Sequence, residues 1–209
     1  YISAAKVGGI LANIKYPKDF IYENLMIQTN IINACNNNNI DKVIFFGSSC
    51  VYPANSIIPI KENYLLAGKP EITNEFYAIA KIAGIKLCES INSQYNRKYK
   101  VIMPCNIYGP NDNFDLNNSH VLPALLLKFH LAAQSNSDTV EVWGNGTSMR
   151  EFLFVEDLAE AAIMIMNSNI EYDHSHFFNV GSGVDISIKK LSSIISEITK
   201  FNGDILFNN

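Results

Sequence analysis

Apolar positions along this chain alternate between two spacings, one typical of helices and one typical of short buried strands. Helical spacing predicts helices over residues 18–35, 75–95, 121–134, 156–168 and 187–200. Short runs of β-branched and aromatic residues predict strands over residues 42–47, 100–103, 140–143, 177–180 and 205–207. This alternation predicts an α/β fold, in which helices cover both faces of a doubly wound, mostly parallel sheet.

Polar residues follow two of the predicted strands at the point where each strand ends. Ser48, Ser49 and Cys50 come after the first strand, and Cys105 and Asn106 follow the second. In doubly wound sheets, ligands bind beyond the carboxyl ends of the strands. We therefore expect the chemistry of this protein at that edge.

A tyrosine and a lysine stand four residues apart in the predicted helix over residues 75–95. Tyr77 and Lys81 therefore share one helix face. A nearby ammonium favours the phenolate, so we expect Lys81 to lower the pKa of Tyr77 from its usual value of about 10. Such a tyrosine could act as an acid or base near neutral pH, and a strand-end serine could hydrogen-bond the same substrate oxygen. Taken alone, a tyrosine and a lysine at this spacing are more often a half-buried tyrosine beside a surface lysine than a catalytic pair.

The glycine-rich turn of a dinucleotide-binding fold is missing from this chain. Gly144 with Gly146, and Gly181 with Gly183, have the first spacing of that motif, but neither pair has a third glycine three residues later. Both pairs come late, where loops or hairpins are expected. Either the protein binds no dinucleotide, or two further βαβ units precede residue 1. Together these two units would have on the order of 60 residues. We expect the chain to be a fragment.

Composition narrows the class of protein. The 209 residues are 48% hydrophobic and 17% charged, which suits one large domain or a domain with a small lobe. The net charge is −4 and no basic stripe is present, which argues against nucleic acid as a partner. No apolar run is long enough for a membrane span, and the first residues do not resemble a signal peptide. The 4 widely spaced cysteines argue against a zinc site or redox pair and favour a reducing cytoplasm.

Several short segments, taken together in order, are more specific than Tyr77 and Lys81 alone. They are Ala4–Gly9, Tyr22–Leu25, Gly47–Pro53, Tyr77–Gly84, Asn106–Phe114, Asn118–Val121, Trp143–Phe152 and Asn179–Asp185. With these segments the chain resembles the extended short-chain dehydrogenase/reductase family from residue 4 to about residue 190. Within that family it is most similar to the enzymes that epimerise GDP-4-keto-6-deoxy-D-mannose at C3 and C5 and then reduce it at C4.

The resemblance implies catalytic roles for five residues. Ser48, Tyr77 and Lys81 would form the reductase triad. In it Tyr77 donates a proton to the C4 oxygen, Ser48 holds that oxygen and Lys81 binds the nicotinamide ribose. Cys50 and His120 would be the epimerase pair, because a thiolate and an imidazole can both exchange protons near pH 7. Taken singly, Cys50 is more often a small buried hydrophobe and His120 a surface residue at a helix start.

The resemblance also implies a cofactor, a substrate and a partner. The cofactor would be NADPH/NADP+, bound by Phe46, Gly47, Ser48, Ser49, Tyr77, Lys81, Pro104, Cys105, Asn106, Ile107 and His120. The GDP-sugar would contact Lys128, Trp143 and Arg150. Lys128 stands where the family commonly has an arginine. The lysine keeps the positive charge but cannot form the paired hydrogen bonds of a guanidinium group. The enzyme would be a cytoplasmic homodimer that pairs helices within residues 18–38 and 75–95, and it would need no metal.

The same resemblance implies a division of the chain into two regions. Residues 1–112 would be the C-terminal part of an NAD(P)-binding Rossmann domain whose N-terminal βαβ units are missing. Residues 113–209 would be mainly a smaller substrate-binding lobe, with about 154–182 returning to the Rossmann domain. Because the phosphate-binding turn is absent, we expect this chain alone to be inactive and to bind NADPH weakly or not at all.

Two other interpretations stay open on the sequence. Another nucleotide-sugar epimerase or dehydratase would share Tyr77, Lys81 and Ser48, although a dehydratase needs an acidic residue near the serine, where this chain has Cys50. A truncated, non-catalytic protein of the same family would lack the first strands of its sheet and expose a strand edge.

Overall fold

The helices and strands follow the alternation seen in the sequence. The computed structural model describes residues 1–116, 118–168 and 177–208, and no helix in these ranges is both long and apolar enough to span a bilayer. The helices are α1 (Ile10–Lys15), α2 (Pro17–Asn37), α3 (Glu75–Tyr95), α4 (Val121–Gln134), α5 (Val155–Asn167) and α6 (Ile188–Thr199), with 3₁₀ helices η1 (Ser49–Val51), η2 (Glu62–Tyr64) and η3 (Ile72–Asn74). The strands are β1 (Lys42–Phe46), β2 (Lys98–Pro104), β3 (Asn106–Tyr108), β4 (Thr139–Trp143), β5 (Met149–Phe154), β6 (Phe177–Val180), β7 (Asp185–Ser187) and β8 (Asp204–Asn208).

Three parallel strands form the main sheet, in the order β1-β2-β6. Phe46 of β1 pairs with Ile102 of β2, and Pro104 of β2 pairs with Val180 of β6. The carboxyl ends of these strands therefore meet at one edge of the sheet. Ile2 adds an isolated parallel bridge to β1. The predicted parallel sheet is confirmed.

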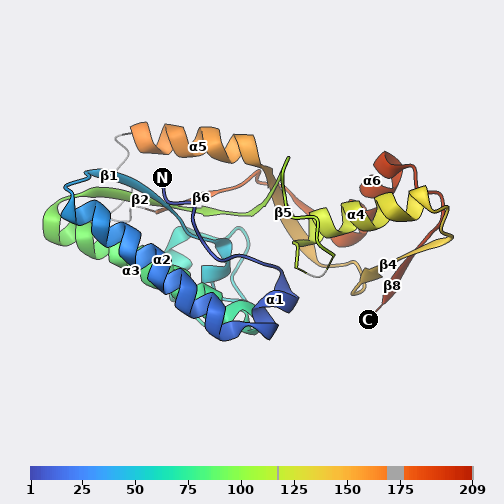
Figure 1. Ribbon diagram of the computed structural model, residues 1–209, viewed down its shortest axis with the longest axis horizontal. Helices are drawn as coiled ribbons and strands as arrows, with labels where there is room; N and C mark the ends of the chain where they lie inside the picture. The colour runs from blue at the N-terminus through green and yellow to red at the C-terminus, as the bar shows by residue number, and fades with distance from the viewer. Residues whose placement is uncertain (117, 169–176, 209) are drawn as a thin grey trace.

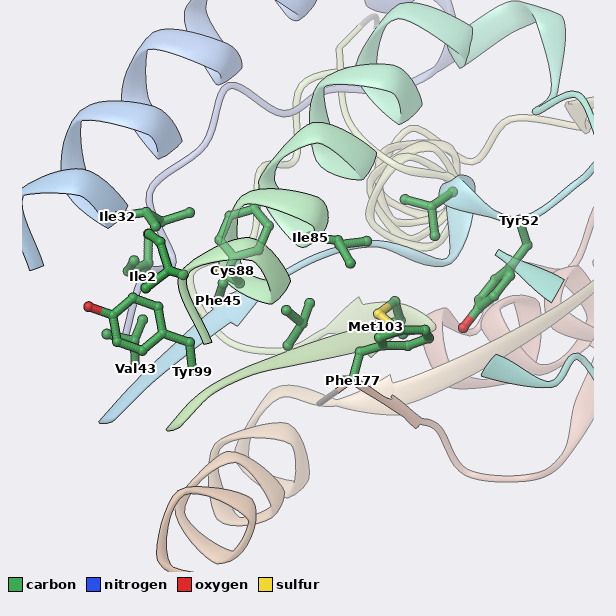
Figure 2. Packing of buried hydrophobic residues seen from close by; sticks show 13 residues of the cluster. Ile2, Ile32, Val43, Phe45, Tyr52, Ile85, Cys88, Tyr99, Met103 and Phe177 are labelled. Atoms are coloured by element: carbon green, nitrogen blue, oxygen red, sulfur yellow. The ribbon is translucent and has the colours of Figure 1, made fainter. Parts of the chain in front are cut away.

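Helices cover both faces of this sheet, as predicted. Figure 1 shows α2 and α3 side by side on one face and α5 on the other. Successive strand residues point to opposite faces. Phe45 therefore packs with Ile32 and Ile85 on the side of α2 and α3 (Figure 2), whereas Ile44 packs with Leu158 on the side of α5. Because β1 is buried on both faces, its sequence is a continuous run of apolar residues.

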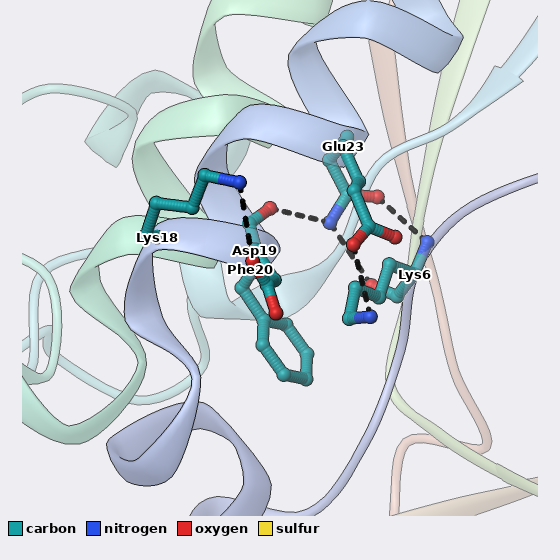
Figure 3. Close-up of polar contacts among 6 residues, drawn as sticks. Lys6, Lys18, Asp19, Phe20 and Glu23 are labelled. Carbon is teal, nitrogen blue, oxygen red and sulfur yellow. Dashed lines mark hydrogen bonds and ion pairs between the residues drawn. The ribbon is translucent and has the colours of Figure 1, made fainter.

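An extended segment near the start of the chain is fixed to α2 by polar contacts. Asn24, only 2% exposed, accepts the N–H of Lys6 at 2.9 Å and donates to the Lys6 carbonyl at 2.9 Å. The Lys6 ammonium also pairs with Glu23 at 3.1 Å (Figure 3). The N–H of Gly9 then donates to the carbonyl of Asn118 at 3.0 Å. This segment therefore ties the loop before α4 to the sheet-bearing part of the molecule.

A second lobe is built from α4, α6 and the parallel pair β4–β8 (Figure 1). Its core contains Phe129, Val142, Leu191 and Ile195. Strand β5 lies between the two parts of the molecule, where it pairs in parallel with β3 and antiparallel with β7. Polar residues of β5 are therefore placed where both parts can contribute to a site.

Four elements, α1, β3, β5 and β7, were not predicted from the sequence. Helix α1 has 6 residues, and β3 and β7 have 3 each, which is too short for a periodic signal. Strand β5 includes the charged residues Arg150 and Glu151, which interrupt its apolar pattern. The division of the chain at residue 112 stays a prediction.

The close approach of α3 to the sheet and to α2 depends on Gly84. A Cβ atom at this position would lie 2.7 Å from the ring of Phe45 and 2.9 Å from the side chain of Gln28. We expect Gly84→Ala to lower the free energy of unfolding by about 1–3 kcal/mol, because overpacking outweighs the better helix propensity of alanine. Urea unfolding of the two proteins measures the difference.

A double-mutant cycle identifies the cause of that loss. Phe45→Leu removes the ring atoms that the new methyl group would meet, so Gly84→Ala should cost less in that background. Equal costs in both backgrounds would contradict a clash with Phe45.

Candidate active site

The carboxyl ends of β1 and β2 bring polar groups to the expected edge of the sheet. Straight after β1, Gly47 donates its N–H to the carbonyl of Ile102 at 2.8 Å. Straight after β2, Cys105 donates its N–H to the last carbonyl of β6 at 3.1 Å. The chain after β1 then turns into η1, where the Ser48 hydroxyl accepts the N–H of Cys50 at 3.3 Å. Ser48 and Cys50 are thus held together by a short local turn.

Helix α3 presents a row of polar groups to the same edge. Lys81, only 3% exposed, donates to the carbonyl of Phe46 at 2.7 Å. Its ammonium lies 5.8 Å from the centroid of the Tyr77 ring, so the predicted shared helix face is confirmed. Asn74 stands three residues before Tyr77, about one helical turn earlier. The end of β1 and the start of α3 therefore face each other.

Four side chains from these two segments form a cluster. The Ser48 hydroxyl lies close enough to the side chains of Tyr77 and Cys50 to oppose the rise in the pKa of each. The Asn74 amide Nδ2 donates to Cys50 Sγ at 3.2 Å. We refer to Ser48, Cys50, Asn74 and Tyr77 as the strand-end cluster. A hydroxyl, a thiol and a phenol placed in this way can hold one substrate oxygen and exchange protons beside it.

Burial controls the ionisation of this cluster. It raises the pKa of Tyr77 well above its usual value, Cys50 adds a smaller upward effect, and the hydrogen bond from Ser48 opposes the shift. The predicted lowering of this pKa by Lys81 is therefore wrong for this structure, because desolvation of the phenolate is the largest effect on it. Burial also raises the pKa of Cys50, opposed by Ser48 and more weakly by Arg150. Tyr77 therefore holds its proton at neutral pH, which suits it as a proton donor.

Burial has the opposite effect on Lys81 and lowers its pKa from 10.5 to about 8. Between these values the unfolded chain binds more protons at this residue than the folded chain, so its contribution to stability rises with pH. We expect the unfolding free energy of the parent protein, measured relative to Lys81→Met, to rise by about 2–3 kcal/mol from about pH 8 to about pH 10.5. Denaturant unfolding at a series of pH values measures this difference.

Lys86→Met is the matched control for that experiment. Lys86 lies on the same helix, and its side chain is 47% exposed. This variant removes a lysine from the same helix without removing a buried charge, so it gives the baseline for the comparison. A flat difference for Lys81→Met would contradict a buried lysine with a lowered pKa.

The residues predicted to bind a cofactor surround these groups. Phe46 to Ser49 continue from β1, and Pro104 to Ile107 continue from β2, beside Tyr77 and Lys81. An ammonium has three N–H donors, and the contact with Phe46 uses one of them. The remaining donors suit neighbouring hydroxyls such as those of a ribose, so the residues present fit a nicotinamide nucleotide.

The residues predicted to bind the sugar nucleotide are divided between two places. Lys128 on α4 donates to the carbonyl of Glu141 at 2.7 Å and lies 5.6 Å from the ring centroid of Trp143. Trp143 is 61% exposed. Arg150 on β5 lies close enough to Cys50 to affect its pKa. The structure therefore places Arg150 within electrostatic range of Cys50, and Lys128 with Trp143 in the second lobe.

His120 occupies the N-cap position of α4 and is exposed. The loop before it packs closely on Gly9, where an added Cβ would lie 2.6 Å from the carbonyl oxygen of Ser119. Over the described ranges no hydrogen bond joins His120 to Cys50. Its pairing with that thiol, and its place beside the cofactor, stay predictions.

Two polar residues at this site were not singled out from the sequence. Asn74 could have been identified from its helical spacing to Tyr77. Glu151 of β5 accepts the N–H of Gly183 at 2.6 Å, and a Cβ on Gly181 would collide with its carboxylate. Glu151 thereby ties β5 to the loop after β6. No local pattern predicts this role, because its partners are backbone groups far along the chain.

Comparison with known proteins gives a family and several relatives. The sequence matches the model of the NAD dependent epimerase/dehydratase family over residues 1–181. It is 52% identical to GDP-L-fucose synthase of Escherichia coli (strain K12), over 100% of this chain and 67% of that protein. The chain spans 62% to 67% of the length of five curated relatives that are 47% to 52% identical to it.

Solved structures with the same fold include enzymes that are named for GDP-sugars. A GDP-D-glycero-L-gluco-heptose synthase from Campylobacter jejuni, in the presence of NADPH, has a TM-score of 0.89 and 36% identity, over 100% of this chain and 71% of that one. A GDP-L-fucose synthetase from Naegleria fowleri bound to NADP has a TM-score of 0.86 and 27% identity, over 98% of this chain and 62% of that one.

Proposed function

This chain belongs to the NAD dependent epimerase/dehydratase family, and we propose that it forms the catalytic part of a GDP-L-fucose synthase. The reaction is epimerisation of GDP-4-keto-6-deoxy-D-mannose at C3 and C5, followed by NADPH-dependent reduction at C4. One observation carries the proposal. The Ser48 hydroxyl accepts the N–H of Cys50 at 3.3 Å and lies close enough to Tyr77 to oppose the rise in its pKa, so the acid for reduction and the base for epimerisation lie in one cluster. The GDP-sugars and NADP in the names of the relatives support this choice of substrate and cofactor.

The reductase step uses the α3 side of the cluster. NADPH, when bound, supplies the hydride that adds to C4. Tyr77 donates its phenolic proton to the C4 oxygen, which becomes a hydroxyl, and Ser48 hydrogen-bonds that oxygen throughout. Lys81, anchored on the Phe46 carbonyl at 2.7 Å, is placed to bind the hydroxyls of the nicotinamide ribose. The raised pKa of Tyr77 keeps its proton in place until the oxygen becomes basic.

The epimerase step uses the η1 side of the cluster. The C4 carbonyl acidifies the protons on C3 and C5, so no metal is needed for their removal. Cys50 as thiolate takes the proton, the negative charge moves to the C4 oxygen, and Ser48 hydrogen-bonds that oxygen. His120 returns a proton to the opposite face of the ring. Arg150 favours the thiolate and so lowers the cost of ionising Cys50.

The GDP moiety is proposed to lie along the second lobe. Lys128 and Trp143 offer a cation beside an exposed aromatic ring, which suits a diphosphate and a flat base. Arg150 supplies a second cation nearer the sugar. Lys128 acts as a point charge without the two-pronged geometry of arginine.

The proposed assembly is a homodimer, in which α2 and α3 of two subunits pair. Apolar side chains exposed on these two helices support it, among them Tyr22 at 52%, Met26 at 45% and Ile79 at 41%. The cytoplasm is the proposed location, which agrees with free thiols at Cys35, Cys50, Cys88 and Cys105.

The test of the proposed function is a reaction with the full-length protein. NADPH and GDP-4-keto-6-deoxy-D-mannose are added, the loss of reduced nicotinamide absorbance is followed, and the sugar product is identified. Net oxidation of NADPH with formation of GDP-L-fucose supports the proposal. Turnover of a nucleotide-sugar with no net oxidation would instead favour a 4-epimerase or dehydratase of the same family.

A further inference from the structure

The turn that begins α3 contributes an unusual contact to the strand-end cluster. Asn74 is the N-cap residue of α3, but its side chain makes no capping hydrogen bond to the helix. An N-cap asparagine ordinarily accepts an N–H of the first helical turn and so stabilises the helix. The amide of Asn74 instead donates to Cys50 Sγ at 3.2 Å, across 24 residues of chain. Helix α3 therefore lacks the usual side-chain capping hydrogen bond, and the Cys50 thiol accepts a hydrogen bond in its place.

The orientation of this amide discriminates between the two forms of the thiol. Nδ2 faces the sulfur, while Oδ1 is buried without a hydrogen-bond partner in the described ranges. A neutral thiol could donate to Oδ1 and satisfy it, whereas a thiolate can only accept, and it accepts from Nδ2. Leaving a carbonyl oxygen unpaired costs free energy. The arrangement is therefore complementary to the thiolate.

We propose that Asn74 is a positioning residue that holds the Cys50 thiolate in line for removal of the sugar proton. This inference rests on the proposed function, because the role of Cys50 as epimerase base is part of it. Three other groups lie within electrostatic range of Cys50: Ser48 from the strand end, Tyr77 from α3 and Arg150 from β5. Asn74 differs from Arg150 in fixing the sulfur without adding charge. Because Asn74 and Tyr77 share one helix face, α3 aligns the base of one step with the acid of the other.

The test measures the ionisation of Cys50 through its rate of alkylation by iodoacetamide, since the thiolate is the reactive form. In the full-length protein, the alkylated peptide that contains Cys50 is quantified by mass spectrometry over a series of pH values. Asn74→Asp replaces the donor with an anionic acceptor of the same shape. We expect its profile to move to higher pH by about one unit, which slows alkylation near neutral pH about tenfold.

Two further variants complete the experiment. Asn74→Ala should move the profile in the same direction by a smaller amount, and it keeps the test available if the aspartate variant does not fold. Thr73→Ala, one residue away, is the matched control and should reproduce the parental profile. Parental profiles for both Asn74 variants would overturn the positioning role. Alkylation profiles displaced to higher pH in the Asn74 variants would support the contact between Asn74 and Cys50. If the Cys50→Ala variant nevertheless still exchanged solvent protons at C3 and C5, the epimerase role of Cys50 would be overturned.

Discussion

Tyr77→Phe is expected to abolish reduction at C4 while solvent protons continue to exchange at C3 and C5. Phenylalanine keeps the ring and its edge-to-face contact with Phe20, at 6.3 Å between centroids, and removes only the hydroxyl. Loss of a general acid typically costs a factor of about 10² to 10⁴ in rate, so NADPH oxidation should fall by that amount. Nicotinamide absorbance measures reduction, and NMR in deuterated water measures exchange at the two carbons.

Tyr95→Phe is the matched control for this variant. Tyr95 lies on the same helix, is 50% exposed and accepts a hydrogen bond from Gln94. It should leave both rates unchanged. Reduction at the parental rate in Tyr77→Phe would assign the proton donor to another group.

Cys50→Ala is expected to have the opposite effect. Without the thiolate, exchange at C3 and C5 should fall by about 10² to 10⁴. Ser48, Tyr77 and Lys81 remain in place, so the reductase lacks only its epimerised substrate. Little GDP-L-fucose should form, although NADPH still binds. The same NMR and absorbance measurements separate these effects.

Mixing the two variants sharpens the test. Tyr77→Phe makes the epimerised ketone, and Cys50→Ala can reduce it, so the mixture should form GDP-L-fucose when neither variant does alone. Cys35→Ala, a half-buried cysteine in α2, is the control and should behave as the parent. GDP-L-fucose formation at the parental rate by Cys50→Ala alone would exclude this thiol as the base.

Much of the fold could be predicted from sequence because the main elements are long or continuously apolar. The predicted helix over 75–95 matches α3, and the predicted strand over 42–47 matches β1 within one residue. The motif resemblance is also confirmed, since relatives about 50% identical to the chain are named GDP-L-fucose synthases. Segments such as β3 and β7, with 3 residues each, escaped prediction because their strand conformation comes from pairing with β5.

The site was predictable in part. Helical spacing alone places Tyr77 and Lys81 on one face, and strand ends alone place Ser48 and Cys50 at the edge of the sheet. Their meeting in one cluster required α3 to pack against the end of β1. That packing depends on Gly84, where a side chain would strike Phe45.

The sequence by itself determined the residue types and their order, and the spacing that places Tyr77 and Lys81 on one helix face and Ser48 and Cys50 at a strand end. Only the tertiary structure decided their ionisation and their partners. Burial of Tyr77 raises its pKa, although the neighbouring lysine suggested the reverse, because desolvation depends on everything packed around the ring. The contact of Asn74 with Cys50 likewise joins residues 24 positions apart. Periodicity reports the neighbours within one element, whereas solvent exclusion and contacts between elements arise only when the elements pack.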